Sequence, residues 1–72
     1  MGFSERLNAL LDERCLGKKD VVSATGISKS AYYRYVTGER EPTTSVLIAL
    51  ANFFNVSTDY LLGRTNNPVM NQ

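Results

Sequence analysis

The sequence predicts a small all-α domain built from five helices, and three observations support this fold class. Apolar residues recur at three- and four-residue intervals along most of the chain, which is the spacing of one buried helix face. Serine, threonine or glycine stands where the helical segments begin, and glycine or asparagine follows most of them. A chain of 72 residues buries only about 60% of its unfolded surface, which favours compact elements that satisfy their own backbone.

The first helix is expected to begin at Ser4, a residue type that caps helices, and to end near Cys15. Glu5 in its first turn suits the positive end of the helix dipole. The apolar positions of this helix are Phe3, Leu7, Leu10 and Leu11. Cys15 is interpreted as a small apolar side chain, half-buried beside Leu16.

Two short helices are predicted next, over residues 18–25 and 29–37. The residues that begin and end them are Gly17 and Gly26 for the first, and Ser28 and Gly38 for the second. The side chains expected to face inward are Val21, Val22, Tyr32 and Tyr35. Two helices joined by a short turn that contains glycine form a helix-turn-helix, whose second helix enters the DNA major groove.

A fourth helix follows the polar loop that ends at Pro42, with Thr43 or Thr44 as its cap and Asn55 as its stop. Its inward stripe is Leu47, Leu50, Ala51 and Phe54. A short fifth helix follows, with Ser57 as its cap and Gly63 after its end. The chain therefore divides into a folded domain, residues 1–63, and a polar segment, residues 64–72, expected to be a flexible tail or linker.

Charge is distributed unevenly along the chain. The net charge is only +1, which by itself is weak for a protein that binds nucleic acid. Residues 14–40, however, carry a net charge of +4, and the rest of the chain carries −3. One face is therefore expected to be positive. The basic residues of this stretch are Arg14, Lys18, Lys19, Lys29, Arg34 and Arg40.

Composition disfavours several function classes. One cysteine and no histidine exclude an internal disulfide and make a zinc site very unfavourable, because four protein ligands are lacking. The sequence has no nucleophile with a base and no glycine-rich phosphate loop, so no enzyme activity, catalytic residue, metal or cofactor is expected. No apolar run reaches the roughly 20 residues of a membrane span, and no signal peptide is recognisable. The chain is expected to be cytoplasmic, with neither a membrane partner nor a small-molecule ligand.

Over residues 3–63, the pattern resembles the phage-repressor and Cro-like helix-turn-helix family, often called the XRE family. The motif positions are Val21, Gly26, Ile27, Tyr35, Gly38 and Pro42. The downstream matches are Leu47, Leu50, Ala51, Phe54, Asn55, Val56, Ser57, Leu61, Leu62 and Gly63. The resemblance implies a compact five-helix lambda-repressor-like domain in which the second and third helices form the helix-turn-helix.

Some positions depart from the family pattern. Lys18 stands where members usually carry glutamine, Val22 where they prefer alanine, and Tyr32 where they favour valine or isoleucine. Many members pair a glutamate near the end of the third helix with an arginine on the first. The matching positions here are Val36 and Leu11, so an apolar contact is expected in place of the ion pair.

The resemblance implies a sequence-specific, double-stranded DNA-binding transcriptional regulator, a repressor of bacterial or phage origin. Base reading is assigned to the exposed face of the third helix: Ser28, Lys29, Ser30, Tyr33 and Arg34. Phosphate contacts are assigned to Lys18, Thr37 and Arg40. Lys29 and Arg34 carry donors for guanine O6 and N7, and Lys18 adds a full charge at a helix N-terminus that already favours anions.

DNA binders of this fold commonly act as homodimers on palindromic operators. Ile48 and Phe53 lie off the inward stripe of the fourth helix, so both are candidate dimer contacts, with a slightly larger core as the alternative. The near-neutral net charge leaves a second function open: a protein-binding module of the same fold, such as an antirepressor or antitoxin partner, with no direct DNA role. Binding to random duplex DNA at low salt separates the two hypotheses.

Overall fold

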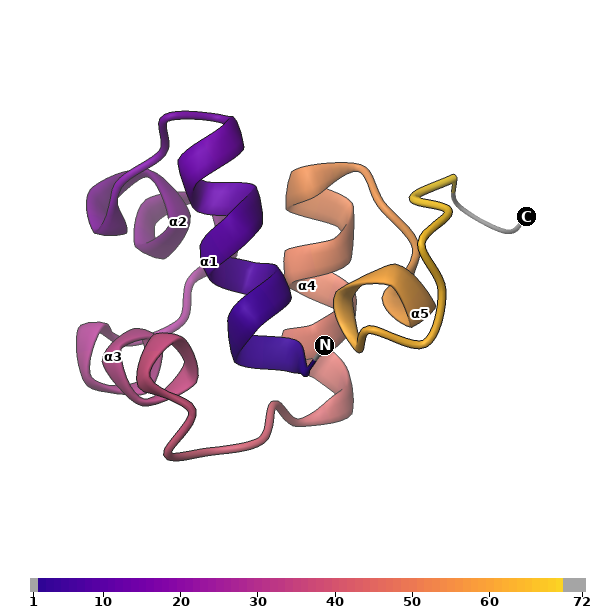
Figure 1. Cartoon of the computed structure of the whole chain (residues 1–72). Helices are drawn as coiled ribbons and strands as arrows, with labels where there is room; N and C mark the ends of the chain where they lie inside the picture. The colour runs from indigo at the N-terminus through magenta and orange to yellow at the C-terminus, as the bar shows by residue number, and fades with distance from the viewer. Residues whose placement is uncertain (1, 70–72) are drawn as a thin grey trace.

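A computed structural model describes residues 2–69, in which the regular elements are five α-helices (Figure 1). They are α1 (Phe3–Glu13), α2 (Lys18–Thr25), α3 (Lys29–Thr37), α4 (Thr44–Phe54) and α5 (Thr58–Leu61). The prediction of an all-α, five-helix fold is therefore confirmed. None of these helices has the length and apolar character needed to cross a membrane.

Helices α1 and α4 occupy the middle of the molecule, and the other three lie to either side of them. Figure 1 shows α2 and α3 together on one side and α5 on the opposite side. Helix α1 contacts both α3 and α5, while α4 contacts both α2 and α5. The helix-turn-helix is thus held by one face of the α1 and α4 pair, which leaves its outer surface to solvent.

The core draws side chains from every helix. Its buried apolar members are Phe3, Leu7, Leu10, Leu11, Val21, Tyr32, Tyr35, Leu50, Ala51, Phe54, Val56 and Leu61. The inward positions predicted at Val21, Tyr32 and Tyr35 are confirmed, whereas Val22 is only half-buried. Where the sequence predicted an apolar contact in place of an ion pair, Leu11 is buried and Val36 packs half-buried against the core.

Helix α1 begins earlier and ends earlier than the sequence predicted. Its N-cap is Gly2, whose N–H donates to Oε1 of Glu5 at 3.2 Å, so Ser4 lies inside the first turn. The earlier start places the ring of Phe3 in the core, where it meets Tyr35 edge-on with 6.1 Å between ring centroids. The packing of Phe3 therefore outweighs the capping preference of Ser4.

The prediction for Cys15 was wrong, because its side chain is exposed rather than half-buried. Helix α1 ends at Glu13, and Cys15 adopts a left-handed conformation (φ 53°) that turns the chain toward α2. Leu16 is the half-buried residue of this loop and packs against the core.

The predicted caps of the other helices are confirmed. The hydroxyls of Ser28, Thr43 and Ser57 accept hydrogen bonds from the first-turn N–H groups of α3, α4 and α5. Left-handed residues follow α2, α3 and α4 at Gly26, Gly38 and Asn55. These short polar signals place the helix ends within a residue of their predicted positions.

Residues 64–69 of the expected tail or linker run along α5 and hydrogen-bond to the body of the domain, whereas residues 70–72 lie outside the described residues. The carbonyl of Pro68 accepts from the N–H of Ser57 at 3.0 Å. Arg6 on α1 donates through Nη2 to the carbonyl of Thr65 (3.4 Å) and to Oδ1 of Asn66 (3.3 Å). Flexibility of this segment stays a prediction.

Candidate nucleic-acid interface

The outer surface of α3 is a continuous polar face. One residue advances about 100° around a helix, so the five residues of this face span an arc of about 140°. All of them are exposed: Lys29, Ser30, Tyr33, Arg34 and Thr37. The opposite side carries buried Tyr32 and Tyr35, which fix the rotation of the helix about its axis. The structure therefore brings four of the five sequence-predicted reading residues together on one face with Thr37, a predicted phosphate contact, and Tyr33 is 60% exposed. The fifth, Ser28, is the N-cap that precedes α3.

Two hydroxyls at the ends of α3 already make hydrogen bonds. Oγ of Ser28 accepts from the N–H of Ala31 at 3.1 Å, which leaves its hydroxyl proton free to donate to a base. Oγ1 of Thr37 instead donates to the carbonyl of Arg34 at 3.2 Å. A phosphate accepts hydrogen bonds only, so Thr37 has to exchange this internal bond for one to DNA.

The N-terminus of α2 is a second polar feature beside α3. The first-turn N–H groups of a helix lack partners within the helix, and the helix dipole favours an anion near them. Lys18 is exposed at this position and adds a positive charge. The carboxylate of Asp20 is turned back to the N-cap, where Oδ2 accepts from the N–H of Gly17 at 2.9 Å.

All six basic residues of the positive stretch are exposed, and five of them extend from the surface away from other elements' hydrogen-bonding groups: Lys18, Lys19, Lys29, Arg34 and Arg40. Arg14 differs, because its guanidinium donates to the carbonyl of Phe54 at the C-terminal end of α4. Its cation also lies 5.8 Å from the centroid of the Phe54 ring. Arg14 therefore joins α1 to α4, and the positive surface rests on the other five residues.

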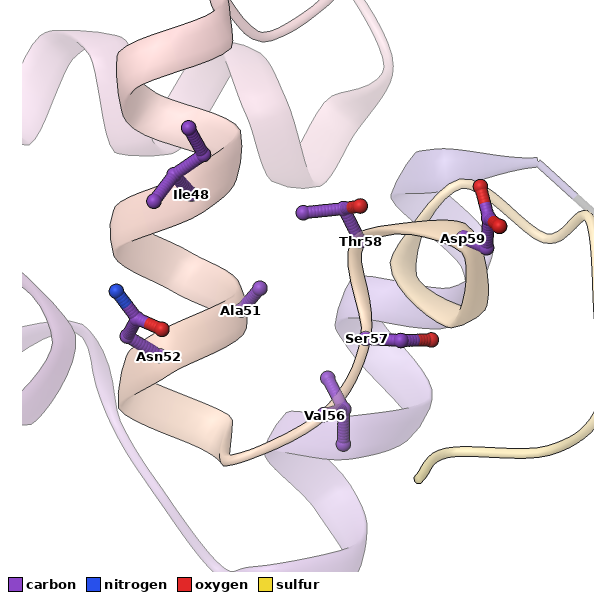
Figure 2. A pocket seen from close by; sticks show the side chains of 7 residues that line it. All are labelled: Ile48, Ala51, Asn52, Val56, Ser57, Thr58 and Asp59. Atoms are coloured by element: carbon purple, nitrogen blue, oxygen red, sulfur yellow. The ribbon is translucent and has the colours of Figure 1, made fainter. Parts of the chain in front are cut away.

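On the other side of the molecule, a shallow groove runs between α4 and the start of α5 (Figure 2). Its volume of about 210 Å³ lies below the usual range of small-molecule sites. Ile48 lines one wall and is 48% exposed. Phe53 is only half-buried, because its ring packs against that of Phe54 with 5.0 Å between centroids. The two candidate dimer contacts are about 140° apart around α4, so they do not form one flat patch.

Two residues that the sequence did not single out join distant parts of the chain. The guanidinium of Arg6 is buried and stacks over the ring of Tyr60, 4.0 Å from its centroid. Asn8 donates to the carbonyl of Val36 at the end of α3. No local pattern marks either residue, because each partner lies far away in the sequence.

Within residues 2–69, no three histidine, cysteine, aspartate or glutamate side chains gather in a way that suits a metal ion. The arrangement consists of exposed amines, guanidinium groups and hydroxyls on α3 and at the start of α2. Such groups donate hydrogen bonds and attract anions.

Comparison with known proteins gives consistent matches. A family model described as helix-turn-helix matches residues 18–61. The uncharacterised HTH-type transcriptional regulator YqaE of Bacillus subtilis is 38% identical over 68 residues, which is 93% of this chain and 59% of YqaE. The HTH-type transcriptional regulator ImmR of the same organism is 33% identical over 64 residues, which is 89% of this chain and 50% of ImmR.

A solved structure is also similar. The crystal structure of a transcriptional regulator from Listeria innocua superposes with a TM-score of 0.79 at 30% sequence identity. The match covers 97% of this chain and 64% of that one. The chain thus spans between half and two thirds of the length of the proteins it matches.

Proposed function

This chain belongs to the XRE-type helix-turn-helix family, and from that premise we propose that it is a sequence-specific DNA-binding transcriptional regulator. Its proposed ligand is double-stranded DNA, read in the major groove by α3. Repression is the proposed outcome, because a domain seated on an operator blocks access to it. No enzyme activity is proposed. We propose that the protein acts inside the cell, where its DNA ligand is located.

The observation that carries this proposal is the free outer face of α3. Its reading residues are exposed on one side, while Tyr32 and Tyr35 hold the other side in the core. Lys29 and Arg34 carry the long, charged donors that suit guanine O6 and N7, and one good bidentate contact contributes about 1–3 kcal/mol of discrimination. Ser28 and Ser30 add hydroxyls, and Tyr33 offers an apolar edge for a thymine methyl group.

Phosphate contacts would set the position of α3 in the groove. Lys18 at the start of α2 and Arg40 after α3 flank the reading face along the chain, and both are exposed. Thr37 adds a hydroxyl between them once its bond to Arg34 is exchanged. These contacts carry no sequence information, but they supply affinity that falls with salt.

Selection of bound sequences from a random duplex library tests the proposal directly. We expect enrichment of one motif and, on random duplex, a log–log salt slope of about −0.9 for each phosphate contacted. Failure to bind random duplex even at low salt would refute the DNA role and favour the protein-binding module instead.

We also propose that two copies bind one palindromic operator. Exposed Ile48 and the groove between α4 and α5 lie away from the α2–α3 side, so a contact there leaves both reading faces free (Figures 1 and 2). Phe53 would contribute from a face of α4 about 140° away from Ile48. A two-fold symmetric pair of reading helices suits half-sites about one DNA turn apart.

A further inference from the structure

Asn8, on the exposed side of α1, makes two hydrogen bonds through one amide nitrogen. Its Nδ2 donates to the carbonyl of Ser4 at 2.9 Å and to the carbonyl of Val36 at 2.9 Å. The first bond lies within α1 and holds the side chain in place. The second reaches the last turn of α3, 28 positions further along the chain. One side chain thus links the N-terminal half of α1 to the end of the reading helix.

The carbonyl of Val36 needs such a donor. The last four carbonyls of a helix lack partners within the helix. In α3, the carbonyl of Arg34 accepts from the N–H groups of Glu39 (2.9 Å) and Arg40 (3.3 Å). The carbonyl of Tyr35 accepts from Gly38 at 3.3 Å. The amide of Asn8 supplies a donor to the next carbonyl, that of Val36.

Two further contacts bring the same ends of α1 and α3 together. Gly38 approaches α1 so closely that a Cβ atom there would lie 3.2 Å from Oγ of Ser4. The rings of Phe3 and Tyr35 meet edge-on below this point. These two contacts are steric and apolar, whereas the bond from Asn8 is directional. The hydrogen bond from Asn8 is therefore suited to set the distance between α1 and the C-terminal end of α3.

We propose that Asn8 is a positioning residue that sets the C-terminal end of α3 and, through it, the selectivity of DNA reading. The claim about selectivity rests on the proposed function, whereas the claim about the position of α3 does not. Arg34, Thr37 and Arg40 lie in or just after the last turn of α3, so a shift of this end displaces them relative to Lys29. Base contacts depend on such geometry, whereas affinity for random duplex depends mainly on charge.

Amide hydrogen exchange tests the positioning half on the full chain without DNA. In Asn8→Ala, we expect the amides of Gly38, Glu39 and Arg40 to exchange about twofold to tenfold faster, the factor that one hydrogen bond supplies. Asn8→Asp keeps the side-chain size but replaces the donor with an oxygen that faces a carbonyl. The same three amides should therefore exchange at least as fast in Asn8→Asp as in Asn8→Ala. The matched control is Asp12→Ala, one turn along the same side of α1, which should leave these amides unchanged.

Unchanged exchange in Asn8→Ala would overturn the proposal, as would parent-like behaviour of Asn8→Asp. A uniform increase over all helices would also overturn it, because it would show loss of general stability rather than release of α3. Exposure of Asn8 makes unfolding an unexpected outcome.

DNA binding tests the second half. On a site selected by the parent, Asn8→Ala should lose about twofold to tenfold in the ratio of selected-site to random-duplex affinity, while binding to random duplex changes little. An unaltered ratio would refute the link to selectivity. Absence of DNA binding by the parent would instead refute the proposed function, and the exchange data would still decide whether Asn8 positions α3.

Discussion

Arg34 and Lys18 carry the same charge, but their places in the fold lead us to propose different tasks for them. Arg34 lies on the outer face of α3, and we propose that it reaches base edges. Lys18 lies at the start of α2, and we propose that it contacts the sugar–phosphate backbone. Removing each charge should therefore affect different properties of DNA binding.

We expect Arg34→Ala to weaken binding to a selected site by about 1–3 kcal/mol and to weaken binding to random duplex much less. Lys18→Ala should weaken both alike and reduce the salt slope by about one. Titration of both duplexes with each variant at two or more salt concentrations measures these effects. Equal losses on both duplexes from both variants would contradict the assigned roles.

Tyr32 gives stability a defined dependence on high pH. Burial raises the pKa of its phenol above the usual value of 10.0, because the charged phenolate loses its hydration. Below that pH, the phenol is protonated in both states and Tyr32 adds no pH dependence. Above it, the unfolded chain releases the proton first, so the free energy of unfolding falls as pH rises.

We therefore expect Tyr32→Phe to remove part of the stability loss that the parent shows above about pH 10. Urea unfolding between pH 8 and about pH 11 measures the slope. Tyr33→Phe is the matched control, because Tyr33 is the next residue and is 60% exposed. The same alkaline slope in the parent and in Tyr32→Phe would show that burial of this phenol does not act as described.

At the level of elements, the glycines that end α2 and α3 have the same backbone conformation but different surroundings. Gly26 and Gly38 have φ values of 77° and 82°, in the left-handed region. A Cβ atom at Gly26 would meet nothing within 4 Å, whereas one at Gly38 would lie 3.2 Å from Oγ of Ser4. Alanine substitutions at these two glycines therefore distinguish the free-energy cost of the backbone conformation from the cost of a steric contact with a neighbouring helix.

We expect Gly26→Ala to lower the free energy of unfolding by about 1–2 kcal/mol from backbone strain alone. Gly38→Ala should cost more, because it adds the contact with Ser4. Urea denaturation of both variants, and of Gly38→Ala combined with Ser4→Ala, measures the difference. A smaller cost at Gly38 than at Gly26, or no relief from Ser4→Ala, would contradict the close approach between α1 and α3.

A structural feature could be predicted from the sequence when the interaction behind it joins residues close together in the chain. Ser28, Thr43 and Ser57 accept hydrogen bonds from N–H groups three residues away, so their caps were recognisable from sequence alone. The start of α1 was misplaced because the packing of Phe3 against Tyr35 acts across the fold. Capping side chains near in sequence thus define most helix ends, whereas tertiary packing defines the start of α1.

The candidate site follows the same rule. Helical periodicity alone placed Lys29, Tyr33 and Arg34 on one outer face, opposite the inward-facing Tyr32 and Tyr35. Periodicity did not reveal that Arg14 turns to the end of α4, or that Asn8 reaches α3. Such links join residues 28 or 40 positions apart, and no neighbouring residue marks them.

At the level of the whole molecule, the proposed tasks are separated in space. The proposed reading face lies on the α2–α3 side of the molecule (Figure 1), and the groove lined by Ile48 lies between α4 and the start of α5 (Figure 2). Buried Arg6 joins α1 to Tyr60 of α5 and hydrogen-bonds to residues 65 and 66, which follow α5. A substitution in the groove should therefore alter association without altering the reading face.

Ile48→Glu tests this separation. We expect the charged side chain to abolish self-association in sedimentation velocity and to weaken binding to a palindromic site much more than to a single half-site. Tyr33→Glu, another exposed apolar side chain on the opposite side, is the control and should sediment as the parent does. Phe53→Glu is less informative, because its ring packs against Phe54. Unchanged association in Ile48→Glu would exclude this groove as the dimer contact.

The central claim, that the outer face of α3 is the surface that meets DNA, is tested most directly by mapping amide chemical-shift changes while a duplex is titrated into the labelled protein. We expect the largest changes to cluster at residues 18–20, 28–34 and 37–40, with α5 little affected. Changes confined to the α4–α5 side, or no saturable change with any duplex at low salt, would contradict it.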